Sequence, residues 1–151
     1  MQIILLTHSR EVSKKTNTGQ LVQQSIPQTL TIIWQRTHPD KKLLRLIESG
    51  NTALVYPSEE KDNSVAHYEF ENFILIDSTW QEARKIYNRS PYLQKLPKIE
   101  LLSDSQSKYT LRRNQLVGGL CTAECAIELL LAKGKTDLAM ELDLSFKNFI
   151  L

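Results

Sequence analysis

The chain has 151 residues, which is enough for one hydrophobic core and short for two domains. Hydrophobic residues make up 41% and charged residues 24%, and five glycines and five prolines exclude a collagen-like or low-complexity architecture. The net charge of +2 gives by itself no argument for a nucleic-acid partner. However, residues 76–113 hold eight basic and four acidic side chains, so the positive surplus lies in the middle of the chain.

Short apolar runs alternate with helical patterns, which predicts an α/β fold with a mostly parallel sheet flanked by helices. We expect the whole chain, residues 1–151, to form this single domain. In chain order, the predicted elements begin with strands Ile3–Thr7 and Leu30–Trp34, helix Lys41–Glu48, and strands Ala53–Tyr56 and Phe73–Asp77. A helix from about Thr79 to Asn88 and strand Ile99–Leu102 follow. The last two elements are a helix with the core-facing stripe Ala123, Ala126, Ile127, Leu130 and Leu131, and helix Asp137–Lys147.

The two cysteines, Cys121 and Cys125, lie four residues apart on a predicted helix and supply only half of a structural zinc set. Since His8, His38 and His67 do not share metal-ligand spacing either, no metal site is predicted. We expect reduced, partly buried thiols, as in a cytosolic protein. The N-terminus lacks a basic region and no apolar stretch approaches the roughly 18 residues of a membrane span, so the prediction is a soluble, cytoplasmic protein without membrane contact.

The most informative motif is Asp-Ser-Thr-Trp at residues 77–80, directly after an apolar strand. Ligands of open α/β sheets bind beyond such strand ends, and the following helix N-terminus favours anionic groups. The same residues could instead cap the helix, with the tryptophan in the core. Along this helix, Arg84 shares a face with Trp80 and Tyr87, and Lys85 and Arg89 lie on an adjoining face. That arrangement suits either a stacked base with its phosphate or a solvated surface.

A second candidate is the basic segment of residues 108–114, which precedes Gly118, Gly119 and an apolar helix. Basic side chains there would position a nucleic acid through its phosphates, although a plain loop with a helix cap explains the pattern as well. The polar tract after the first strand contains His8, Arg10 and the segment 16–19, and a lone histidine beside an arginine is usually structural or solvated. The sequence contains no glycine-rich phosphate fingerprint and no nucleophile elbow, so dinucleotide, P-loop and hydrolase chemistry are unsupported.

Together these segments resemble the DTW-domain family, named for an Asp-x-Thr-Trp motif that reads Asp-Ser-Thr-Trp here. Segments similar to family motifs occur in family order at residues 16–19, 77–85, 88–93, 96–97, 109–113 and 120–124, which covers nearly the whole chain. The resemblance implies a SPOUT-like fold whose C-terminal half forms a trefoil knot, a rare topology. It also implies a tRNA-uridine aminocarboxypropyltransferase, which moves the 3-amino-3-carboxypropyl group of S-adenosylmethionine to uridine N3 in tRNA and releases methylthioadenosine.

The resemblance further implies the site residues. Catalytic roles are expected for Asp77, Thr79 and Trp80, with Asp77 either the base for the imide proton or the group that holds the ammonium of the cofactor. The loops after Tyr56, Ile76 and Leu116 are expected to meet around S-adenosylmethionine, so the predicted cofactor-binding residues are Tyr56, Pro57, Ile76, Asp77, Ser78, Leu116, Leu120, Cys121, Thr122 and Glu124. RNA contacts are expected from Arg10, Arg84, Lys85, Arg89, Tyr109, Arg112 and Arg113, with Trp80 or Tyr109 holding the unstacked uridine.

Many members of the family carry a cysteine cluster ahead of the catalytic domain, and this sequence begins almost directly at a strand. We therefore expect no metal and no RNA contact from such a module. Knotted relatives are often dimeric, which makes a homodimer a candidate assembly. Two other functions stay open: an RNA methyltransferase of the same broad fold, and a small RNA-binding protein without catalysis.

Overall fold

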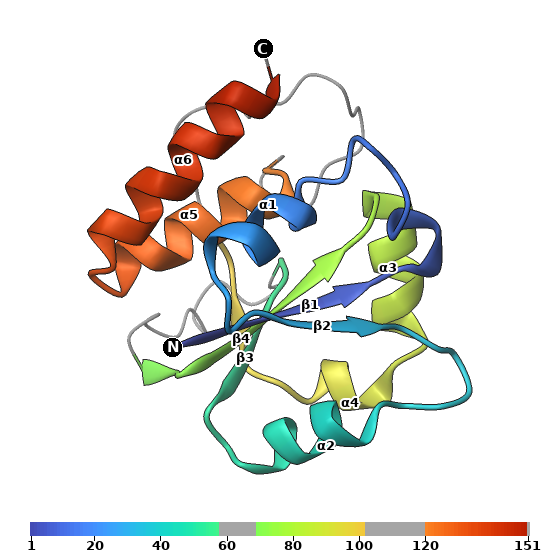
Figure 1. The fold of residues 1–151 in the computed structure, drawn as a ribbon. Helices are drawn as coiled ribbons and strands as arrows, with labels where there is room; N and C mark the ends of the chain where they lie inside the picture. The colour runs from blue at the N-terminus through green and yellow to red at the C-terminus, as the bar shows by residue number, and fades with distance from the viewer. Residues whose placement is uncertain (58–68, 102–119, 151) are drawn as a thin grey trace.

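The computed structural model describes residues 1–57, 69–101 and 120–150. Five strands form one sheet in the order β2-β1-β4-β3-β5, and every pairing between neighbours is parallel (Figure 1). The strands are β1 Gln2–Thr7, β2 Leu30–Ile33, β3 Thr52–Val55, β4 Asn72–Asp77 and β5 Lys98–Ile99. The predicted α/β fold with a parallel sheet flanked by helices is confirmed.

Helices cover both faces of the sheet, which explains why its central strands are apolar without interruption. Side chains that alternate along β1 and β4 divide between two cores: Ile3, Leu5, Phe73 and Leu75 in one, and Ile4, Leu6, Ile74 and Ile76 in the other. The first core lies beneath α1 Gly19–Ser25, α5 Thr122–Ala132 and α6 Thr136–Ile150. The second lies beneath α2 Lys41–Glu48, α3 Trp80–Asn88 and α4 Pro91–Gln94 on the opposite face (Figure 1).

The helices with strong local signals begin where the sequence predicts. The carboxylate of Asp40 caps α2 by accepting a hydrogen bond from the backbone N–H of Leu43 at 3.0 Å. Thr79 and Glu82 form a capping box at the start of α3. The sequence does not predict α1, α4 or the 3-10 helix η1 Ser9–Glu11, because helices this short show too little apolar periodicity.

The sequence places Leu131 on the core-facing stripe of α5, and this prediction is wrong. Leu131 is 48% exposed, whereas Cys125 and Leu129 are buried. The helix packs against α1 and α6 as well as the sheet, so these neighbours set its buried face. Strand ends also differ from the prediction. β3 ends one residue before Tyr56, and β5 begins one residue before its predicted start and ends at Ile99, so Glu100 and Leu101 of the predicted strand lie outside it.

The trefoil knot stays a prediction, because the loop after Leu116 lies outside the described residues. None of the described helices combines the length and the apolar character needed to cross a bilayer.

The ends of β1 and β4 lie side by side where the connections of the chain diverge. Thr7 and Asp77 are partners in the parallel register. After β1 the chain enters α1 on one face of the sheet, and after β4 it enters α3 on the other (Figure 1). Open α/β sheets bind ligands in the crevice that forms at such a point. The topology therefore predicts a site at the ends of these two strands.

Candidate functional site

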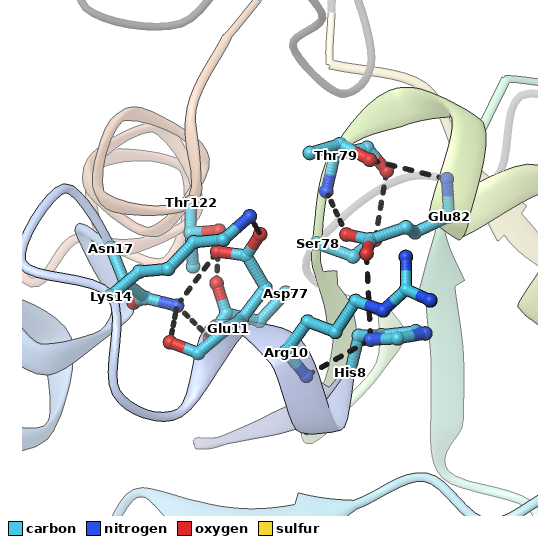
Figure 2. Close-up of polar contacts among 10 residues, drawn as sticks. All are labelled: His8, Arg10, Glu11, Lys14, Asn17, Asp77, Ser78, Thr79, Glu82 and Thr122. Atoms are coloured by element: carbon cyan, nitrogen blue, oxygen red, sulfur yellow. Dashed lines mark hydrogen bonds and ion pairs between the residues drawn. The ribbon is translucent and has the colours of Figure 1, made fainter.

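Asp77, the last residue of β4, is the centre of a buried hydrogen-bond network (Figure 2). The residue is 3% exposed. Its Oδ2 accepts hydrogen bonds from the Thr7 hydroxyl at 3.2 Å and from the Asn17 amide at 3.0 Å. Its Oδ1 accepts a hydrogen bond from the Thr122 hydroxyl at 2.9 Å. The carboxylate therefore joins β4 to β1, to the segment before α1 and to the first residue of α5.

Burial raises the pKa of Asp77 above the usual value for an aspartate. The hydrogen bonds from Asn17, Thr122 and Thr7 act in the opposite direction, and the nearby charge of Glu11 adds to the rise. The net effect moves the pKa of this carboxylate toward neutral pH, where a general base works best.

A second buried carboxylate, Glu11, lies next to the same amide group. Glu11 is 0% exposed, and its Oε1 pairs with the Lys14 ammonium at 3.0 Å. The Asn17 Nδ2 atom lies 3.3 Å from Glu11 Oε2 and 3.3 Å from the Glu11 backbone oxygen. One side-chain amide thus serves both Glu11 and Asp77, as Figure 2 shows.

The sequence does not predict Thr7, Glu11 and Asn17 as partners of Asp77. Local spacing does not show that the polar tract after β1 folds back onto a strand that lies 60 residues later in the chain. The signal available in the sequence is the family-like segment 16–19, where polar side chains stand beside a glycine.

Thr79, a predicted catalytic residue, caps α3. Its Oγ1 accepts a hydrogen bond from the Glu82 backbone N–H at 3.3 Å, and its own backbone N–H donates to Glu82 Oε1 at 3.1 Å. His8 Nδ1 lies 3.5 Å from the other carboxylate oxygen (Figure 2). Burial acts to raise the pKa of Glu82, but the Thr79 hydrogen bonds and His8 hold it below its usual value. The capping role of Thr79 is thus observed, and its catalytic role stays a prediction.

Trp80 lies in an aromatic cluster that we define as Tyr56, Trp80 and Tyr87. The Tyr56 ring centroid lies 5.6 Å from that of Trp80 and 4.2 Å from that of Tyr87, on which it stacks. Lys98 Nζ lies 5.4 Å from the centroid of the Tyr87 ring. Burial, chiefly, raises the pKa of Tyr56, and nearby Arg84 acts in the opposite direction. Aromatic rings with basic neighbours are the combination that binds unstacked bases.

The N-terminus of α5 is already partly occupied by side chains of the protein itself. The Cys121 backbone N–H donates to Glu124 Oε1 at 3.1 Å. The Ala123 backbone N–H donates to Thr18 Oγ1 at 3.1 Å. These two amides, which the sequence offers to an anionic ligand, are therefore committed to structural contacts.

The remaining predicted residues fall into three groups. The strand ends and the start of α5 carry the predicted cofactor residues Tyr56, Pro57, Ile76, Ser78, Leu120, Cys121 and Glu124. Four predicted RNA-binding side chains are exposed, namely Arg10 on η1, Arg84 and Lys85 on α3, and Arg89 directly after it. Tyr109, Arg112, Arg113 and Leu116 lie outside the described residues, so their roles stay predictions.

Both cysteines are free and buried, whereas the sequence predicts partly buried thiols; their reduced state stays a prediction. Burial raises the pKa of Cys121 to about 12 and also raises that of Cys125. Because the thiolate is the reactive form, we expect slow reaction with a maleimide at neutral pH in the native protein and complete reaction after denaturation. Mass spectrometry over time measures both rates, and rapid labelling of the native protein would contradict this expectation.

Within the described ranges, no group of three or more His, Cys, Asp or Glu side chains is arranged to hold a metal ion.

The family model of the DTW domain matches residues 1–151. The chain belongs to the DTW domain family. Among curated proteins, tRNA-uridine aminocarboxypropyltransferase 2 of Drosophila melanogaster is 32% identical over 142 residues, which cover 85% of this chain and 55% of the relative. This DTW domain therefore spans about half the length of that relative, and no solved structure matches it significantly.

The motif that names the DTW domain has three distinct structural environments here. Asp77 is the buried centre of the hydrogen-bond network, Thr79 caps α3, and Trp80 belongs to the aromatic cluster. The Asp77 network thus lies on the α1 and α5 side of the strand ends, and the aromatic cluster lies on the α3 side.

Proposed function

We propose that this DTW domain transfers the 3-amino-3-carboxypropyl group of S-adenosylmethionine to N3 of a uridine in tRNA. The observation that supports this proposal most is Asp77, a buried carboxylate at the end of β4, in the same motif as Trp80 of the aromatic cluster. The name of the fly relative supports the same reaction class. In this reaction the bond between sulfur and the γ-carbon breaks and a bond from N3 to that carbon forms. The N3 proton passes to a base, and methylthioadenosine leaves with the electron pair.

The described residues supply the kinds of group that would bind parts of such a donor. A cavity of about 120 Å³ at the end of β1 is lined mainly by polar side chains, among them Asp77, Asn17, Glu11 and Lys14. Carboxylates there suit the ammonium of an amino acid, and the aromatic cluster suits a planar base. When bound, S-adenosylmethionine supplies the transferable group on a carbon that its sulfonium activates. Holding that carbon toward the uridine is the positioning task of the protein.

Asp77 has one of two tasks in this proposal, and both need its ionised form. As a base it accepts the N3 proton, and as a cofactor ligand it pairs with the ammonium. A carboxylate offers about four acceptor positions, and donors among the described residues occupy three of them. No donor within residues 1–57, 69–101 and 120–150 takes the fourth position, on Oδ1, and we propose that a ligand does.

Exposed Arg84 and Arg89 are proposed to contact phosphates of tRNA. Because each phosphate contact releases about one counterion, replacing both residues by alanine is expected to lower the slope of log affinity against log salt by about two. Fluorescence anisotropy with labelled tRNA over a salt series measures the slope. As the control, Lys135→Ala with Lys147→Ala removes the same charge on the opposite side of the sheet. An unchanged slope in the arginine variant contradicts these contacts.

The function itself is tested by incubating the protein with S-adenosylmethionine and tRNA, followed by mass spectrometry of nucleosides and small products. The expected products are an aminocarboxypropyl uridine and methylthioadenosine. A methylated base with S-adenosylhomocysteine would instead identify a methyltransferase. Binding of tRNA without calorimetric binding of S-adenosylmethionine would identify an RNA-binding protein without this activity.

A further inference from the structure

A single amide group, that of Asn17, holds two buried carboxylates at the candidate site. We propose that Asn17 and Glu11 are positioning residues that act through Asp77, fixing the orientation of its carboxylate and setting its charge state. The inference rests on the proposed function only for the claim that Asp77 takes part in transfer.

The side-chain amide of Asn17 contacts both carboxylates. Asn17 Nδ2 lies 3.0 Å from Asp77 Oδ2 and 3.3 Å from Glu11 Oε2, so its two hydrogens face both carboxylates. Thr7 and Thr122 hold the Asp77 carboxylate from β1 and α5 at 3.2 and 2.9 Å. With donors from three segments, this carboxylate is restricted to one orientation, and Asn17 is the contact that links it to Glu11.

The backbone around Asn17 is itself held in place, so the amide is preorganised. The Asn17 backbone N–H donates to the Lys14 carbonyl at 3.1 Å. The Asn17 carbonyl accepts a hydrogen bond from the Gln20 side chain at 2.8 Å. Asn17 is also buried, which reduces the competition of bulk water for its amide.

Asn17 and Glu11 influence Asp77 in opposite directions. The hydrogen bond from Asn17 favours the ionised carboxylate and lowers the pKa of Asp77, whereas the negative charge of Glu11 raises it. Lys14 pairs with Glu11 at 3.0 Å and offsets part of that charge. From β1 and α5, the groups that contact Asp77 are the neutral hydroxyls of Thr7 and Thr122. Both proposed tasks of Asp77 depend on this balance, because both need the ionised form.

The test compares Asn17→Ala with Glu11→Gln by following the Asp77 carboxyl carbon in an NMR pH titration of labelled protein. Loss of the amide donor is expected to raise the titration midpoint of Asp77, and loss of the Glu11 charge is expected to lower it by a smaller amount. Glu48→Gln, at the exposed end of α2, is the matched control and should leave the midpoint unchanged. If Asn17→Ala does not fold, the isosteric Glu11→Gln variant still tests the downward shift.

The second readout is the pH dependence of the transfer rate. Its acidic limb should move to higher pH in Asn17→Ala and to lower pH in Glu11→Gln, as the two midpoints do. A purely structural role would lower the rate at every pH without moving this limb. Unchanged midpoints, shifts in the same direction, or shifted midpoints without a matching limb would overturn the proposal. If the wild-type chain transfers no group, the proposed function fails, and the titration still decides the roles of Asn17 and Glu11 because it needs no substrate.

Discussion

Replacement of Asp77 by asparagine is expected to lower the rate of transfer at least about a hundredfold while the fold stays intact. Both proposed tasks of Asp77 need a negative charge, which asparagine lacks. The amide oxygen can still accept the Asn17 hydrogen bond, and its NH₂ group can donate to the Thr122 hydroxyl, which accepts as readily as it donates. Single-turnover rates with saturating tRNA and S-adenosylmethionine measure the effect, and thermal melting checks the fold.

Alanine is the less informative replacement at this position. Asp77→Ala leaves three buried donors without their acceptor, at a cost of about 1–3 kcal/mol for each group left unsatisfied. A slow alanine variant would therefore report loss of structure as well as loss of chemistry. Asp137→Asn, on the exposed first turn of α6, is the matched control with normal rates expected. Normal transfer by Asp77→Asn would remove Asp77 from the mechanism.

The raised pKa of Asp77 also predicts how stability depends on pH. A carboxyl group with a raised folded-state pKa binds its proton more tightly in the native state. Ionisation of this buried carboxyl group lowers the free energy of unfolding. That loss of stability is absent below the usual aspartate pKa and develops as the pH rises through the folded-state pKa. The Asp77→Asn variant should therefore lose less stability than the wild type over that pH window.

Addition of one methyl group at Gly19 is the second change with a large expected effect. A Cβ atom there would lie 2.6 Å from Asp77 Oδ2 and 2.8 Å from Asn17 Oδ1. Gly19 has no positive φ, and alanine is the better helix former by about 1 kcal/mol, so the close approach is the reason for glycine. We expect Gly19→Ala to lower the free energy of unfolding by about 1–3 kcal/mol, because the methyl group displaces both side chains. The rate of transfer should fall with it.

Gly50→Ala is the control that separates loss of stability from loss of transfer. Gly50 has φ +86°, and a Cβ there would meet no atom within 4 Å. Its replacement is expected to cost about 1–2 kcal/mol through backbone strain alone, without effect on transfer. Urea denaturation and transfer rates of both variants test the difference. Full stability and activity in Gly19→Ala would mean that the network tolerates the methyl group and that close approach at this position is not required.

Much of the fold follows from local patterns in the sequence. Continuous apolar runs such as Ile3–Leu6 predict buried parallel strands, because only strands covered on both faces avoid polar positions. The capping residues Asp40 and Thr79 predict the starts of α2 and α3, because each satisfies amides within its own first turn. These signals are local, so neighbouring residues are enough to determine them.

The network around Asp77 depends instead on contacts between segments that lie far apart in the sequence. The sequence by itself determined that this carboxylate stands at the end of an apolar strand, and the family-like segments pointed to its importance. Only the tertiary structure decided that it meets Asn17, 60 residues earlier, and Thr122, 45 residues later. The buried face of α5 and the exposure of Leu131 were decided in the same way. These contacts depend on strand order and on which helices share a face, and no local pattern of residues encodes either.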